Sequence, residues 1–198
     1  MRSEVGPSGE DARSVYQRVL GERFTQLDPQ LRTYFGALPP GAVGRGEGVY
    51  AVAGSRHRWL WPVLAVLAWR RVLFPELGTD VPFTVQNTAG ADGTLSAVRT
   101  FSFPRVERRM EDTMRVVDGR FVDGLGRRRG LVVEMELSVE AGSVKMRSRR
   151  VWVRIAGRHL PLGRLARVTL HERADAAEPG RQHVDVRISL PLLGEVFR

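Results

Sequence analysis

Between Asp11 and Leu27 the apolar and polar positions recur with the period of an amphipathic helix. The apolar positions are Val15, Tyr16, Val19, Leu20 and Phe24. This i, i+3, i+4 spacing predicts a helix over Asp11–Leu27, with Asp11 or Ser14 as its N-cap. Asp28-Pro29 then ends it and starts a second short helical piece, Gln30–Phe35, because proline fits a first helical turn.

Four glycines, at positions 41, 44, 46 and 48, lead into a short apolar run, Val49–Val52. A phosphate-binding loop would follow a strand and open a helix, whereas here the glycines come before the apolar run. We therefore expect a flexible entry to a strand.

The most apolar part of the chain, Trp59–Leu73, is apolar on nearly every side of a helix, and Pro62 suits its first turn. Its uncharged stretch of 11 residues is far shorter than the roughly 20 that a membrane span needs. We expect this helix to be buried under a curved sheet, with Trp59, Trp61 and Trp69 inside.

From Val81 onward the apolar positions recur every second residue, as in strands that have one buried face. Turn signals such as Asp118-Gly119 and Ala141-Gly142 separate the runs, which predicts roughly seven to nine strands joined by tight turns. Antiparallel meanders satisfy such short connections.

One run changes parity: Val144 and Met146 are apolar at even positions, whereas Val151, Val153 and Ile155 are apolar at odd ones. This flip predicts a bulge near Ser148–Arg150, and bulges curve a sheet. The patterns together predict an α+β fold, with N-terminal helices and a strongly curved, half-barrel-like antiparallel meander packed on the apolar helix. We expect a disordered N-terminus over residues 1–10 and a single domain over 11–198.

The amino-acid composition excludes several kinds of chemical site. The 198 residues contain no cysteine, which excludes disulfides and thiolate metal sites and is compatible with a reducing cytoplasmic location. Residues 1–10 contain no apolar core and so do not form a secretory signal. The net charge is +9, and the chain is arginine-rich, with Lys145 as its only lysine. Such a skew is also typical of GC-rich coding.

The positive charge is concentrated in residues 141–167, which contain eight basic and no acidic side chains. Candidate anion-binding residues there are Lys145, Arg147, Arg149 and Arg154. They favour contact with an anionic lipid surface over nucleic acid, because no nucleic-acid-binding motif accompanies them.

Conventional catalytic patterns are missing from the sequence. The four histidines lack metal-ligand spacing, and the serines lack a nucleophile-elbow motif. We therefore predict no catalytic residue, metal or cofactor. The candidate ligand-binding residues are the large apolar groups expected between sheet and helix, together with one arginine on the same strand: Trp59, Trp61, Trp69, Phe101, Phe103 and Arg99.

Seven stretches along nearly the whole chain resemble a bacterial family known as domain of unknown function 4166. They are YQRVLGERF (16–24), GRGEGVYAV (44–52), LFPELGTDVPFTVQN (73–87), RTFSFP (99–104), FVDGLG (121–126), LPLG (160–163) and LPLLGEVF (190–197). Members of this family occur alone or fused behind dehydrogenase-like NAD-binding domains. The resemblance implies at most a role accessory to redox enzymes, and it brings no activity or catalytic residue.

Three functions are compatible with these patterns. The favoured one is non-enzymatic binding of a small apolar or amphiphilic molecule in a pocket between the curved sheet and the helix. The second is an enzyme for an anionic substrate, with Arg99, Arg105 or Arg109 orienting it and Glu107 or Asp112 as base. The third is a protein-interaction module that docks through an open sheet edge or through strands within 141–167.

Overall fold

The N-terminal helices are shorter than the sequence predicts. The computed structural model describes residues 13–39, 41–155, 158–163 and 166–198. Helix α1 (Val15–Leu20) begins at Ser14, which forms a capping box with Gln17. Gly21, at φ 56°, ends α1, and a 3₁₀ helix, η1 (Gly21–Gln26), follows. The expected helix over 11–27 is therefore wrong in its second half, and its first two residues lie outside the described residues.

Helix α2 (Pro29–Tyr34) begins as predicted, with Asp28 as N-cap and Pro29 in the first turn. The Asp28 side chain accepts a hydrogen bond from the Gln30 amide. Another backbone bond, from the Asp28 amide to the Gly142 carbonyl at 2.9 Å, ties the start of α2 to a turn of the sheet. The two N-terminal helices thus have a fixed position against the strands.

Apart from the N-terminal helices and one helical segment between its first two strands, the described fold is one 11-stranded sheet in which the paired strands are antiparallel. Its strands are β1 (Val43–Gly54), β2 (Leu77–Ala89), β3 (Leu95–Phe103), β4 (Val106–Val117), β5 (Arg120–Leu125), β6 (Leu131–Glu140), β7 (Ser143–Ile155), β8 (Arg158–Pro161), β9 (Arg167–Ala174), β10 (Gln182–Leu190) and β11 (Gly194–Phe197). The order follows the chain, except that β8 pairs only with β7 and β9 also joins β7. The predicted curved α+β meander is confirmed, with more strands than expected.

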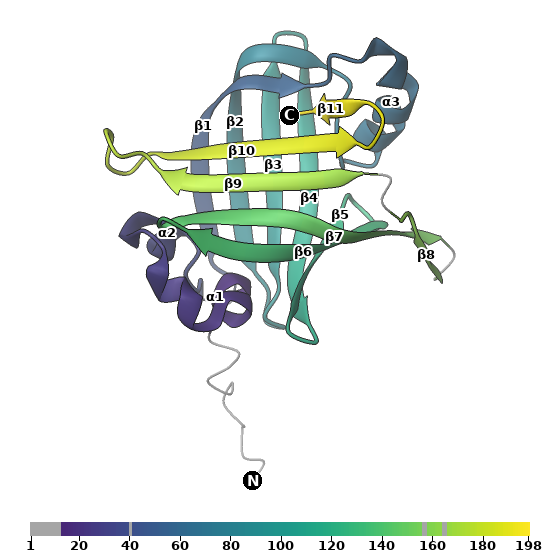
Figure 1. Ribbon diagram of the computed structural model, residues 1–198. Coiled ribbons are helices and arrows are strands. Elements are labelled where there is room, and N and C mark those ends of the chain that lie inside the picture. The colour runs from purple at the N-terminus through teal and green to yellow at the C-terminus, as the bar shows by residue number, and fades with distance from the viewer. Residues whose placement is uncertain (1–12, 40, 156–157, 164–165) are drawn as a thin grey trace.

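The meander folds over on itself into two facing layers. Figure 1 shows β1 to β4 running steeply behind β6, β7, β9 and β10, which cross in front of them. The predicted bulge lies in β7: Glu134 pairs with Arg150 and Met135 with Ser148, so Arg149 is the extra residue. Beyond this bulge β7 pairs with β8, and before it with β9. The bulge thus allows β7 to have two different neighbours along its length.

The two edge strands meet at one corner without closing a barrel. The Gly54 amide donates to the Arg198 carbonyl at 2.6 Å, and the Arg198 amide donates back at 3.1 Å. Gly54 has φ 121°, and a Cβ there would lie 1.8 Å from the Glu76 carbonyl oxygen. At this end the backbone groups of Gly54 and Arg198 therefore satisfy each other, while the sheet stays open between β1 and β11.

Two separate apolar clusters fill the space between the layers. The first packs α1, η1 and α2 against β3 to β7 and β9, around Leu31 and Val144. The second surrounds Phe74, whose ring lies 4.9 Å from that of Phe101 and 5.1 Å from that of Phe197. The interior is therefore divided into two clusters.

The apolar helix is α3 (Trp61–Trp69), preceded by the 3₁₀ turn η2 (Arg58–Leu60). Its expected burial is wrong, because Leu64 is its only fully buried residue and Trp59, Trp61 and Trp69 are exposed. The reason is position: Figure 1 shows α3 at the upper corner of the sheet, outside the two layers. One side of the helix packs on the second cluster while the others face outward.

The glycine-rich segment is also different from its predicted form. Residues from Val43 onward belong to strand β1, and Gly44, Gly46 and Gly48 lie on its inward face. A Cβ at Gly48 would approach Phe83 to 2.7 Å, and one at Gly46 would approach Val85 to 3.1 Å. The glycines thus allow the side chains of β2 to lean across β1.

We predict that Gly54→Ala strongly destabilises the fold. The new Cβ meets the Glu76 backbone, and alanine disfavours this positive φ, so the free energy of unfolding should fall by roughly 3 kcal/mol or more. Urea unfolding measures this. The matched control is Gly41→Ala: its φ is 77° with open space around the Cβ, and it should lose only about 1 kcal/mol. Equal losses in both variants would contradict the steric account.

Candidate functional site

Four charged side chains face the interior of the folded sheet: Arg99 on β3, Asp112 on β4, Asp123 on β5 and Glu172 on β9. Their positions in the alternating pattern of each strand place these side chains on the inward face. Each interrupts an inward row of apolar residues, such as Ala97-Arg99-Phe101 or Leu170-Glu172. Because side chains alternate across a strand, a charge in such a row must point inward with its neighbours.

Arg99 and Asp112 form an ion pair at the boundary between the two apolar clusters. The Arg99 Nη1 donates to the Asp112 Oδ1, and diagonal positions on neighbouring strands bring them together. On β3, Ala97 belongs to the first cluster and Phe101 to the second, with Arg99 between them. The Asp112 side chain is 3% exposed, whereas that of Arg99 is 30% exposed. The arginine therefore retains accessible surface on the concave face.

Two carboxylates on this face are incompletely satisfied. The Oδ1 of Asp123 and the Oε2 of Glu172 are buried and have no hydrogen-bond partner among the described residues. A buried polar atom without a partner costs on the order of 1–3 kcal/mol, and such exceptions occur mainly where water, a ligand or chemistry is involved. The described residues contain no His, Asp or Glu group arranged to hold a metal ion.

Burial is the largest single influence on the pKa values of these four groups. It raises the pKa of Glu172 from 4.5 to about 7, and Arg99 only partly opposes this rise. Burial and the neighbouring Asp112 raise the pKa of Asp123 well above its ordinary value. Burial also raises the pKa of Asp112, against the attraction of Arg99. Burial alone would lower the pKa of Arg99, but Asp112 and Asp123 raise it overall, so this side chain stays charged.

Tyrosines line the same interior. Burial raises the pKa of Tyr50 to about 12. Burial likewise raises the pKa of Tyr34, while hydrogen bonds to Asn87 of β2 and Gln182 of β10 lower it. Tyr34 is nevertheless 37% exposed, so its side chain lies at the outer edge of this interior. Hydroxyl groups thus lie beside the charged groups.

A small apolar surface lies beside Glu172 on the neighbouring strand β10. Val184 and Val186 on β10 share the inward face with Glu172 and are half-buried, yet neither belongs to one of the two clusters. The glycines on the inward face of β1 add no side chains there. The central part of the concave face therefore combines a polar group of four charged residues with a small apolar surface. We call it the concave site: Arg99, Asp112, Asp123, Glu172, Val184 and Val186.

The structure separates the residues that the sequence suggested. Among the predicted ligand-binding residues, Arg99 lies in the concave site, Phe101 is buried in the second cluster, and Phe103 is half-buried beside it. The three tryptophans lie at the outer corner. Of the alternative enzyme residues, Asp112 faces inward, whereas Glu107 and Arg109 are exposed and pair with each other on the outer face. Arg105 is exposed in a turn.

The basic residues of β7 are exposed and partly neutralised. Lys145 pairs with Glu140, and Arg149 makes two hydrogen bonds to Glu136. Arg154 donates to the Arg128 carbonyl, and Arg147 is exposed. Glutamates on β6 therefore offset part of the positive charge that residues 141–167 suggest.

Glu172 and Asp123 were missed by sequence reasoning. Glu172 lies between His171 and Arg173 and resembles part of a polar strand face, and Asp123-Gly124 resembles a turn. A signal was present: Glu172 continues the row of Val168 and Leu170, and Asp123 lies between Phe121 and Leu125. Both residues are charged side chains in a series of apolar residues that recurs at every second position. That pattern would have identified them as inward-facing.

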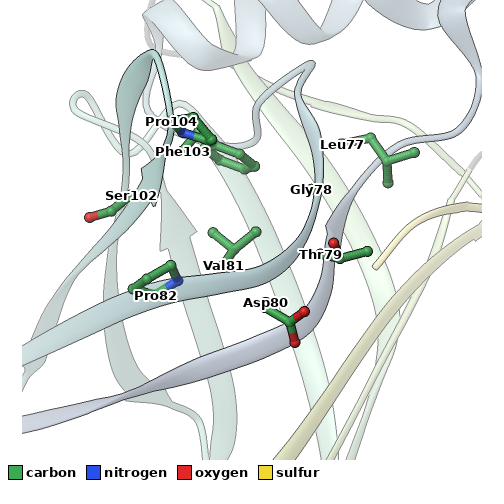
Figure 2. A pocket seen from close by; sticks show the side chains of 9 residues that line it. All are labelled: Leu77, Gly78, Thr79, Asp80, Val81, Pro82, Ser102, Phe103 and Pro104. Carbon is green, nitrogen blue, oxygen red and sulfur yellow. The ribbon is translucent and has the colours of Figure 1, made fainter.

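A depression lies at the rim, where β2 begins, away from the concave site. It has a volume of about 590 Å³ and is lined by residues 77–82 and 102–104. Figure 2 shows Val81 and Phe103 within it and Asp80 pointing away from both. Apolar groups dominate its lining, and it contains no group comparable to the charges of the concave site.

Comparison with known families gives a match that covers α2 and the whole sheet. The family model described as Domain of unknown function (DUF4166) matches residues 27–198, from the end of η1 to the last residue. The chain belongs to this family. Searches of curated proteins and of solved structures gave no match. In the described part of this DUF4166 chain, every helix is too short or too polar to cross a membrane.

We predict that Glu172 makes the stability of this DUF4166 domain fall as pH rises. Between pH 4.5 and 7 the folded state holds a proton on Glu172 that the unfolded state has released. The free energy of unfolding should therefore fall by roughly 3 kcal/mol across this window, at 1.36 kcal/mol per pKa unit. Urea unfolding at pH 4.5 and pH 8 measures this change.

Glu172→Gln should remove most of that fall and be more stable than the unmodified protein at pH 8. The matched control is Asp185→Asn, which removes an exposed carboxylate from the neighbouring strand and should leave the pH profile unchanged. A Glu172→Gln profile that parallels the unmodified protein would show that Glu172 titrates like a solvated carboxyl group.

Proposed function

We propose that this domain binds a small amphiphilic molecule in the concave site, with its polar group at Arg99 and Glu172 and its apolar part against Val184 and Val186. The observation that carries the proposal is the pair of buried, unpartnered carboxylate oxygens on Asp123 and Glu172. They lie in an interior where Arg99 is still 30% exposed. Small-molecule sites typically combine an apolar lining with a few convergent polar groups.

The charge balance of the site indicates the polar group that it accepts. Arg99 is charged and paired with Asp112, while burial favours the protonated forms of Asp123 and Glu172. Below pH 7 the site therefore offers a cation and the protonated carboxyl group of Glu172, which can donate a hydrogen bond. A carboxylate or hydroxyl head group fits this set of donors, whereas a second cation does not.

Acid–base catalysis is a second candidate, favoured by one observation. A carboxyl group with a pKa of about 7 gains and loses its proton near neutral pH, which is the range that a general acid or base requires. In that case Glu172 would transfer the proton and Arg99 would hold the anionic part of the substrate. The binding proposal requires fewer features of the site than catalysis does, because it needs no reacting group beside Glu172.

Ligand titration of the purified domain tests the proposal. Decanoate and decanol share an apolar chain and differ in the head group. Calorimetry with both therefore distinguishes the contribution of the charged residues from that of the apolar surface. We expect decanoate to bind more tightly at pH 6 than at pH 8, because ionised Glu172 repels it. Decanol binding should change less. The absence of binding by either compound, together with no co-purifying ligand in native mass spectrometry, would contradict the proposal.

We predict that Val186→Gln weakens ligand binding about tenfold or more, because it introduces an amide where the apolar chain packs. Val186 is half-buried, so the fold should tolerate the change. Arg187→Gln is the matched control: it changes the adjacent residue on the outer face of β10 and should leave the affinity unchanged. Equal affinities in the two variants would place the ligand elsewhere.

A further inference from the structure

A group of large apolar side chains is exposed around α3. Their exposed fractions lie between 57% and 63%, far above those of the cluster residues, and the members are Trp59, Trp61, Val63, Val66 and Trp69. Leu64 is the only fully buried residue of this helix. Scattered apolar residues are normal on a surface, but a contiguous group of this kind marks an interaction site.

A second exposed apolar segment lies at the same corner. The turn between β10 and β11 exposes Leu192 to 97% and Leu193 to 46%. Strand β11, which directly follows this turn, lies close to the residue before η2, because the His57 ring nitrogen Nε2 lies 3.2 Å from the Glu195 carbonyl oxygen. Figure 1 shows α3 and this turn together at the upper corner of the molecule. We call the two segments the corner patch: Trp59, Trp61, Val63, Val66, Trp69, Leu192 and Leu193.

The corner patch is bordered by positive charge. Arg56, Arg58 and Arg70 are exposed, and none of them has a carboxylate partner among the described residues. The Arg70 guanidinium lies over the Trp69 ring, 5.1 Å from its centroid. No acidic residue occurs between Ser55 and Pro75.

Glu111 and Glu195 do not cancel this charge. Glu111 pairs with Arg71, and Glu195 lies 3.7 Å from Arg198 and 3.9 Å from Arg187. Free arginines beside exposed tryptophans and leucines match the surface of an anionic bilayer. There, indole rings occupy the head-group region and guanidinium groups contact lipid phosphates.

We propose that the corner patch binds peripherally to membranes that contain anionic phospholipids. Helix α3, with nine residues, would lie in the interface plane, and the Leu192-Leu193 turn would enter the outermost acyl region. A protein partner would need an acidic, apolar surface, whereas an anionic bilayer presents negative charge and an apolar interior together. This inference is independent of the ligand proposed for the concave site.

Vesicle co-sedimentation tests the proposal with the complete chain. We expect binding to vesicles of phosphatidylcholine mixed with phosphatidylglycerol, little binding to pure phosphatidylcholine, and release at high salt. Replacing Arg56, Arg58 and Arg70 together by glutamine should weaken binding roughly a hundredfold, from the usual contribution of each basic residue near such a surface. Trp61→Ser with Leu192→Ser should weaken it at least tenfold, without unfolding, because both side chains are exposed.

Two matched controls make the result decisive. Arg147, Arg150 and Arg154 replaced together by glutamine remove the same net charge from β7 and should retain most of the binding. Val43→Ser with Val49→Ser removes exposed apolar groups from β1 and should retain all of it. The proposal is overturned if the β7 triple variant loses as much affinity as the corner variant, or if neither vesicle binds. It is also overturned if light scattering shows a dimer that the Trp61 variant dissociates.

Discussion

The ion pair between Arg99 and Asp112 determines how the interior of this sheet is organised. It lies where the two apolar clusters meet, so neither cluster continues across the centre of the molecule. Removing one partner of such a pair costs about 3–5 kcal/mol, because the other charge stays buried. An apolar pair of similar volume would join the clusters into one core. The fold instead maintains a polar centre, where Glu172 and Asp123 contribute atoms without partners.

Local rules of strand formation were enough to predict the meander. The turns at Asp118-Gly119 and Ala141-Gly142 have positive φ at both residues, as tight hairpins require. The parity change in β7 predicted the bulge at Arg149, because the inward row can change parity only where a residue is inserted. These features depend on neighbours in the sequence. The family resemblance over most of the chain was confirmed for the same reason, since its motifs are local stretches.

The candidate site depended on contacts between distant strands and was therefore only partly predictable. Arg99 was identified, but its partners lie on other strands, and Glu172 approaches from the opposite layer. The tryptophans of α3 were misplaced because an apolar helix suggests burial, and the sequence does not show that this helix lies at a corner. Strand β11 was missed because its four residues carry too short a pattern, although Phe197 completes the second cluster.

The concave face is a polar site within the apolar interior. The carboxyl titration of Glu172, followed by carbon-detected NMR and assigned with Glu172→Gln, tests it most directly. A midpoint near pH 7 agrees with a carboxyl group buried opposite Arg99. A midpoint near 4.5 would mean that Glu172 is solvated like a surface residue, and it would contradict both the site and the ligand chemistry derived from it.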